Sequence, residues 1–318
     1  MSVGLVIGVR GIVGKDVRSR TRGYWRPMLQ LTVYLGLVAA AVVAVLGLSI
    51  SSTGSLSPTL GESLFAALAL GSTLLIAFVA PGLTAGAISG ERERRTLDLL
   101  LVTRASPLGL IVGKLAGALL WILYLLIASL PALAIVNLYG GVPLLQAAAA
   151  LTVTVATAIS YTSLGLMLSA MLRRTVLATV LVYGVVLVTL TVVPIVSASL
   201  SVSSVLNTGS TSLSGVPGGQ LGLPPPSAWL TFISPVSASI SVLGGTGGPL
   251  LGGTGGGSSL VVTYVMRPSG PVAEVRTVTS LAPWVFYTLL SLVFAALGVI
   301  VGAFSLRPRL PRFGRRRA

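Results

Sequence analysis

Residues 115–172 read LAGALLWILYLLIASLPALAIVNLYGGVPLLQAAAALTVTVATAISYTSLGLMLSAML, 58 residues without a charged side chain. A transmembrane helix needs about 20 mostly apolar residues to cross a hydrocarbon core of about 30 Å, so this stretch is too long for one helix. The glycines and the proline of Tyr139–Pro143 mark a turn that divides it. The stretch therefore predicts two membrane-spanning helices joined in a hairpin.

The rest of the chain continues this pattern. Apolar residues make up 54% of the chain and charged residues 8%, whereas a soluble domain carries about 25% charged residues. The sequence predicts an all-α membrane protein with about six transmembrane helices in a single domain, 1–318. The expected spans are 28–50, 64–89, 110–138, 144–171, 175–196 and 281–306.

The distribution of basic residues predicts the orientation of these helices. The chain has 21 Lys and Arg against six Asp and Glu. All the basic residues except Arg267 and Arg276 fall in four clusters, within 1–26, 92–114, 173–174 and 307–317. Six spans put these clusters on one side, which the positive-inside rule assigns to the cytoplasm. We expect both ends inside, the chain in the cell membrane among lipid, and no nucleic-acid partner.

Segments outside the spans have their own predicted roles. Residues 1–26 suggest an interfacial amphipathic helix, the alternative being a basic disordered tail, and 307–318 form a cytoplasmic tail. A long external loop, 199–280, contains a glycine-rich stretch and two β-branched runs, Leu260–Met266 and Val272–Val278, that predict a small hairpin. Ser227–Gly244 is apolar, but Pro235 interrupts it, so we expect a re-entrant or outer-surface segment.

Most enzyme and carrier chemistries lack their usual residues here. There is no Cys or His, which removes the thiolate nucleophile and the commonest general base and metal ligand, so we expect no catalytic residue, metal or cofactor in this chain. None of the six acidic residues lies in the middle of a span, which argues against a proton- or sodium-coupled carrier. Gly109–Lys114 lacks the spacing and the following Ser or Thr of a phosphate-binding loop.

The connection between the second and third spans is the most informative charged segment. Residues 88–104 read ISGERERRTLDLLLVTR. Ser89 can cap a helix that has Glu91 and Glu93 in its first turn, and the spacing predicts i,i+4 pairs of Glu91 with Arg95 and of Arg94 with Asp98. Leucines 97, 100 and 101 share a face with Arg104. Ser106 and Pro107 then open the third span, so we expect a short amphipathic helix at the cytoplasmic surface.

This segment resembles the permease subunits of ATP-binding-cassette (ABC) transporters of the type-2 permease, or type V exporter, family. The matching elements are Gly90–Glu93, Thr96–Leu101, Ser106–Pro107 and Gly113–Lys114, whereas Arg95 and Arg104 replace a usual Gly and Pro. The resemblance implies an exporter subunit that pairs with a second permease copy and docks a coupling helix on separate ATPase subunits, which hold ATP and magnesium. The residues implied in coupling are Glu91, Arg92, Glu93, Arg94, Thr96, Leu97, Asp98, Leu100, Leu101 and Arg104.

Two other functions remain open from the sequence. One is an ATP-independent membrane scaffold whose outer part binds a partner, and the other is a secondary carrier driven by an ion gradient. The substrate leaves no motif. The uncharged side chains of Gln30, Thr73 and Tyr161 are candidates for lining a substrate path, although ordinary hydrogen bonding between helices is the favoured explanation for them.

Overall fold

The fold is taken from a computed structural model of the chain. The structure describes residues 31–36, 38–40, 43, 44, 47, 60–95, 107–139, 142, 144–196, 199, 233–243, 258–267, 270–279 and 283–306. Within these ranges, five helices are long and apolar enough to cross a membrane: Gly61–Glu93, Pro107–Ala134, Leu144–Met171, Thr175–Val196 and Trp284–Ser305. The prediction of a helical, multi-pass membrane protein is confirmed.

The helices follow the predicted spans closely. Helix α3 covers Leu60–Thr84, α6 covers Pro107–Tyr139, α7 covers Leu144–Met171, and α12 covers Pro283–Ser305. Helix α8, Thr175–Leu187, continues into a π-helical turn, η1, at Val188–Val192. The predicted first span, 28–50, is described only in part, with 31–36 and 38–40 helical. The basic N-terminal segment and the C-terminal tail lie outside the described residues.

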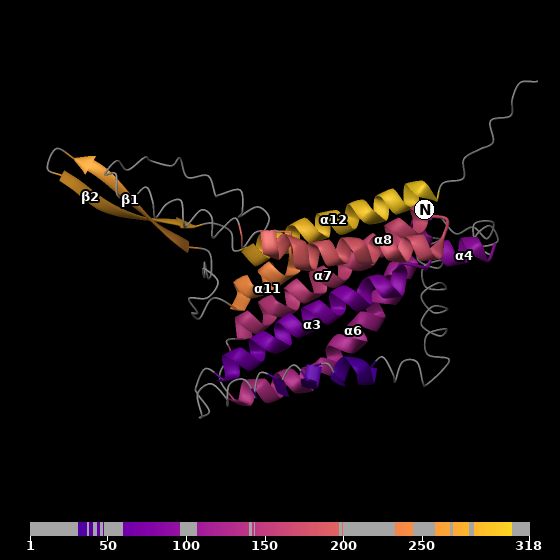
Figure 1. Ribbon diagram of the computed structural model, residues 1–318, viewed down its shortest axis with the longest axis horizontal. Helices are drawn as coiled ribbons and strands as arrows, with labels where there is room; N and C mark the ends of the chain where they lie inside the picture. The colour runs from indigo at the N-terminus through magenta and orange to yellow at the C-terminus, as the bar shows by residue number, and fades with distance from the viewer. Residues whose placement is uncertain are drawn as a thin grey trace, which may run out of the picture.

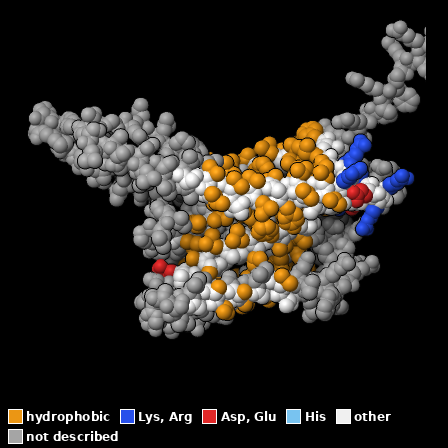
Figure 2. Space-filling view, viewed as in Figure 1, with side chains coloured by type: hydrophobic (Ala, Val, Ile, Leu, Met, Phe, Trp, Pro, Cys, Tyr) orange, Lys and Arg blue, Asp and Glu red, His pale blue; other side chains and the backbone are white. Residues whose placement is uncertain are grey.

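Helix α7 is the centre of the bundle and packs against α3, α6, α8 and α12, which run beside it (Figure 1). Five of its buried Ser and Thr hydroxyls donate hydrogen bonds to backbone carbonyls one turn earlier, as Thr157 does to Val153 and Ser160 to Ala156. These bonds let small polar residues lie inside a membrane bundle without unsatisfied donors. Around α7, helices α8 and α12 expose aliphatic side chains (Figure 2).

The predicted path-lining residues Thr73 and Tyr161 are both buried within the chain. The Thr73 hydroxyl lies 2.9 Å from that of Thr154, and the Tyr161 hydroxyl lies 2.6 Å from that of Thr189. Each bond joins two helices of the same chain, which is the ordinary interhelical hydrogen bonding expected as the alternative. That these two residues line a substrate path stays a prediction, and Gln30 lies outside the described part.

The remaining elements follow α8. Helix α11, Pro235–Leu243, lies within the segment predicted to be re-entrant or at the outer surface, and it packs against α3, α7 and α12. The Gln146 amide of α7 donates a 3.0 Å bond to the Val242 carbonyl. Strands β1, Ser258–Arg267, and β2, Gly270–Thr279, pair in antiparallel register and contain the two β-branched runs. That these elements are external stays a prediction.

Candidate functional site

The connector between α3 and α6 begins with a short helix, α4, Ser89–Glu93, at one end of the bundle (Figure 1). Ile88 and Ser89 are fully buried there. The Ser169 hydroxyl oxygen of α7 accepts bonds from the Ile88 N–H at 2.9 Å and the Ser89 N–H at 3.0 Å. The prediction that Ser89 caps this helix is therefore wrong: Ile88 occupies the N-cap position without a side-chain bond, and a different helix supplies the acceptor.

An ion pair fastens α4 to α6. The Lys114 Nζ donates to the Glu91 Oε1 at 2.9 Å and to the Ala87 carbonyl at 2.9 Å. The Lys114 side chain is only 6% exposed, and a lysine is rarely buried unless it is paired. Glu91 was expected to pair with Arg95, but α4 ends at Glu93, so the helical spacing behind that expectation does not continue.

A second carboxylate fastens α4 to α8. The Glu93 Oε1 accepts from the Thr175 N–H at 2.8 Å, and both carboxylate oxygens accept from the Thr175 hydroxyl, at 3.2 and 3.0 Å. Thr175 is the first residue of α8, whose N-cap residue Arg174 makes no side-chain cap bond. The Glu93 carboxylate therefore caps α8 from outside and places negative charge at the positive end of its dipole.

The charged side chains around α4 differ in exposure: Glu91 is half-buried, whereas Glu93 is exposed, like most of the arginines at this end. Arg92 is half-buried and donates a 3.4 Å bond to the Leu172 carbonyl at the end of α7. Arg94, Arg95, Arg173 and Arg174 are exposed, and the basic side chains gather at this end of the molecule (Figure 2). Arg95 has φ of 56°, a left-handed conformation that ends α4 and that favours glycine.

Residues 11–247 match the protein family described as "ABC-2 family transporter protein". The chain belongs to this family. It is therefore a multi-pass membrane permease of the ABC transporter class, a transport subunit, as the resemblance implied. No curated protein matches the chain.

In this ABC-2 permease, two motif elements that are distant in the sequence meet at one point. Glu91 belongs to the Gly90–Glu93 element and Lys114 to the Gly113–Lys114 element, and their side chains form the ion pair. Four predicted coupling residues, Glu91, Arg92, Glu93 and Arg94, lie on or directly after α4. The other six lie outside the described residues, so their place stays a prediction: Thr96, Leu97, Asp98, Leu100, Leu101 and Arg104.

Three residues of the site were missed as partners of the connector. Lys114 could have been found, because a single charge just inside an apolar span needs a counter-charge and the nearest acids in the sequence are those of the connector. Thr175 gives a weaker signal: it follows two arginines at the predicted start of a span, which indicates a helix N-terminus but no particular partner. Ser169 gives none, because many small hydroxyl residues occur on α7.

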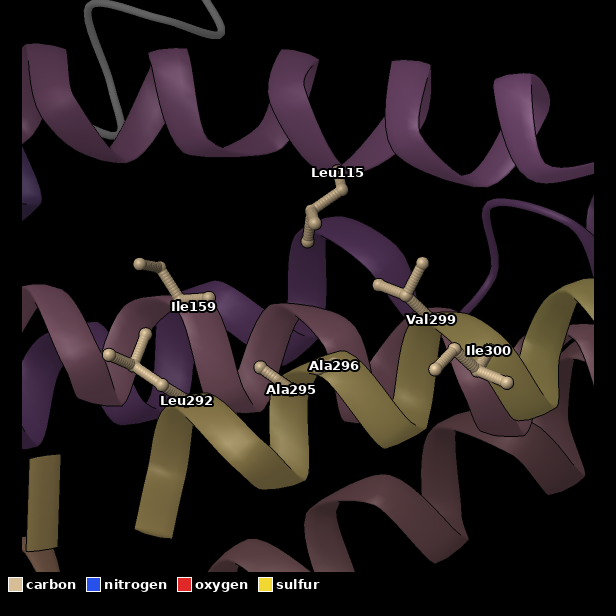
Figure 3. Close-up of a pocket in the computed structure, with 7 residues that line it drawn as sticks. All are labelled: Leu115, Ile159, Leu292, Ala295, Ala296, Val299 and Ile300. Carbon is tan, nitrogen blue, oxygen red and sulfur yellow. The ribbon is translucent and has the colours of Figure 1, made fainter. Parts of the chain in front are cut away.

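The permease also has an apolar groove of about 340 Å³ between α6, α7 and α12 (Figure 3). Aliphatic side chains alone line it, from Leu115, Ile159, Leu292, Ala295, Ala296, Val299 and Ile300. A surface of this composition offers dispersion contacts and no hydrogen-bonding side chain, so it provides no group for acid–base chemistry. The charged contacts around α4 are therefore the stronger candidate site.

Proposed function

We propose that this permease is the membrane-spanning half of an ATP-driven exporter in the cell membrane, energised by separate ABC ATPase subunits through α4 and the residues that follow it. The observation that carries the proposal is the arrangement around α4. Its two glutamates bond to α6 and α8 of the same chain, and the side chains of Glu93, Arg94 and Arg95 are exposed. Because α4 is bonded to two other helices, its exposed charged side chains form a fixed surface to which a partner protein can bind.

The side of the membrane follows from charge. Arg92, Arg94 and Arg95 lie on or next to α4, and Arg173 and Arg174 lie directly before α8, to which α4 is bonded. Five basic residues at one end of a helical bundle favour the cytoplasmic face. This assignment places both chain ends inside, and it places α4 where ATP and a soluble ATPase occur.

The nature of the contact also follows from charge. Four exposed arginines present a cationic surface, which favours a partner with an acidic surface and speeds its association. ATP and magnesium would be held by the ATPase, and we assign no cofactor to this chain. As the family resemblance implies, a second permease, identical or different, would complete the transporter, and the substrate would cross between the two copies.

Co-purification tests this function. The chain is solubilised from its native membranes, purified by a tag, and probed for the ABC ATPases of its organism, those encoded beside its gene first. The proposal predicts an ATPase in stoichiometric amount and hydrolysis of ATP by the complex. Transport driven by an ion gradient without ATP would instead indicate a secondary carrier. Purification without an ATPase, together with no transport, would indicate a scaffold.

A further inference from the structure

Three contacts fasten the connector to three different helices. Ser169 of α7 accepts the first N–H groups of α4, Lys114 of α6 pairs with Glu91, and Thr175 of α8 donates to Glu93. Each contact includes a hydrogen bond of 3.0 Å or less. We call this set the connector clasp.

The connector lies beside the first residue of α8. A Cβ atom at Gly90 would lie 3.5 Å from the Thr175 Cγ2, and one at Gly86 would lie 4.0 Å from the same atom. Both are ordinary van der Waals distances, so the connector backbone lies beside Thr175 and a small side chain at either position would fit. The Glu93 carboxylate then reaches both the N–H and the hydroxyl of Thr175.

Along its own length α8 has a narrow attachment to the bundle. Its buried residues are Ala178, Val182 and Val186, one turn apart on a single stripe, and aliphatic side chains on its other faces are exposed. Small side chains on one stripe give little contact area to resist displacement of the helix end. The bond from Thr175 to Glu93 therefore adds to the attachment of this end of α8, which residues 172–174 also join to the end of α7.

We infer that Glu91 and Glu93 are positioning residues of the clasp, not contacts for the ATPase. They fasten the connector so that it moves as one body with the cytoplasmic ends of α6, α7 and α8. Glu93 is exposed, but both its carboxylate oxygens are bonded to Thr175, and the exposed arginines meet the partner. The identity of that partner rests on the proposed function. The fastening itself rests only on contacts within the chain.

A disulfide across the clasp tests whether it stays closed. The chain has no cysteine, so Gly90→Cys with Thr175→Cys places the only two thiols at the contact. The complex with the ATPase is oxidised in lipid nanodiscs, and the cross-link is measured by loss of maleimide labelling. We expect the disulfide to form in equal yield without nucleotide and with ATP and vanadate. We also expect the complex to hydrolyse ATP at the same rate after the disulfide has formed. A yield that falls with nucleotide, or hydrolysis that stops on locking and returns with reductant, would overturn the inference.

The control pair is Gly90→Cys with Val176→Cys. Val176 is the next residue along α8 and is 74% exposed, so little cross-link should form if the contact is specific to Thr175. An equal yield from both pairs would mean that thiol collision, not the clasp, determines the reaction, and would count against a fixed contact.

Neighbouring substitutions separate positioning from binding. Glu93→Ala should lower the yield of the Gly90–Thr175 cross-link about fivefold, the size of effect expected for loss of a helix cap, and leave the amount of bound ATPase unchanged. Arg94→Ala should reduce ATPase binding and leave the cross-link yield unchanged. The inference would be overturned if Glu93→Ala reduced ATPase binding and left the cross-link yield unchanged, while Arg94→Ala lowered the cross-link yield and left ATPase binding unchanged. Glu93→Gln keeps the shape of the side chain and should show a weaker version of the Glu93→Ala effect.

These outcomes distinguish the clasp from the proposed function. If the wild-type chain binds no ATPase, the proposed function fails, while the cross-link yields with and without Glu93→Ala still decide whether the fastening exists. If the wild-type chain binds an ATPase and Glu93→Ala abolishes that binding with a normal cross-link, the proposed function stands and the clasp fails.

Discussion

The Lys114 ammonium lies 2.9 Å from the Glu91 carboxylate and joins α6 to α4 at the charged end of the helical bundle. The lysine is almost fully buried, whereas the side chain of the glutamate is 23% exposed. A pair of this kind contributes little when both partners are present, but each partner becomes costly when the other is removed. This asymmetry allows the pair to be tested by matched substitutions.

Lys114→Met should destabilise the permease by about 2 kcal/mol, less than for a fully buried pair because water reaches part of Glu91. The double variant Glu91→Gln/Lys114→Met should recover part of that loss, since it leaves no carboxylate without its cation. The thermal unfolding midpoint of the purified protein in detergent measures both effects. Purely additive effects of the two substitutions would contradict a direct interaction.

Arg95→Gly should stabilise the protein by about 0.5–1 kcal/mol, because glycine adopts the left-handed φ of 56° without the steric cost that arginine has there. Arg94→Gly is the control. Arg94 has φ of −78°, so glycine gains nothing at that position and should be neutral or slightly destabilising. In the same detergent, the thermal unfolding midpoint of Arg95→Gly should therefore be higher than that of Arg94→Gly.

Ser169→Ala should cost about 1–2 kcal/mol, because the N–H groups of Ile88 and Ser89 lose a buried acceptor. Ser72→Ala makes the same chemical change where the hydroxyl bonds only to the Ala69 carbonyl of its own helix. That control should remain within about 0.5 kcal/mol of wild type. Equal midpoints for the two variants would show that Ser169 does not hold the start of α4.

Gly165→Ala should destabilise the packing of α7 against α3. A Cβ there would lie 3.3 Å from the Thr84 Cβ and closer still to its hydroxyl, so Thr84 would have to give up its 3.1 Å bond to the Thr162 carbonyl. We expect a cost of about 1–3 kcal/mol. Gly184→Ala in α8 meets no atom within 4 Å and should be neutral or stabilising, since alanine favours helix. Thermal unfolding of both variants measures the difference.

The helices of this fold were predictable because hydrocarbon thickness sets their length and charges mark their ends. Helix α7 covers the predicted 144–171, a span bounded by the glycines and proline before it and by Arg173 after it. The end of α4 was not predictable. An arginine at position 95 gives no local signal for a turn. The helical spacing of the connector therefore predicted a helix that continues beyond Glu93, where α4 ends.

The partners of the connector depend on tertiary packing. Glu93 and Thr175 are 82 positions apart in the sequence, and only the packing of α8 beside α4 brings them together. The sequence identified the glutamates as important but assigned them outward, toward an ATPase. That coupling role stays a prediction. In the structure the carboxylates of Glu91 and Glu93 bond to Lys114 and Thr175, because α4 lies against the ends of α6, α7 and α8, a placement that helical periodicity does not encode.

The most direct test of the account is the affinity of the purified ATPase for the permease in lipid nanodiscs, measured for wild type and for Arg94→Glu/Arg95→Glu. If the exposed arginines meet an acidic surface, charge reversal should weaken binding at least tenfold, equivalent to about 1.4 kcal/mol. Added salt should weaken wild-type binding in the same direction. Unchanged affinity in the charge-reversed variant, with the protein still folded, would contradict coupling through this end of the permease.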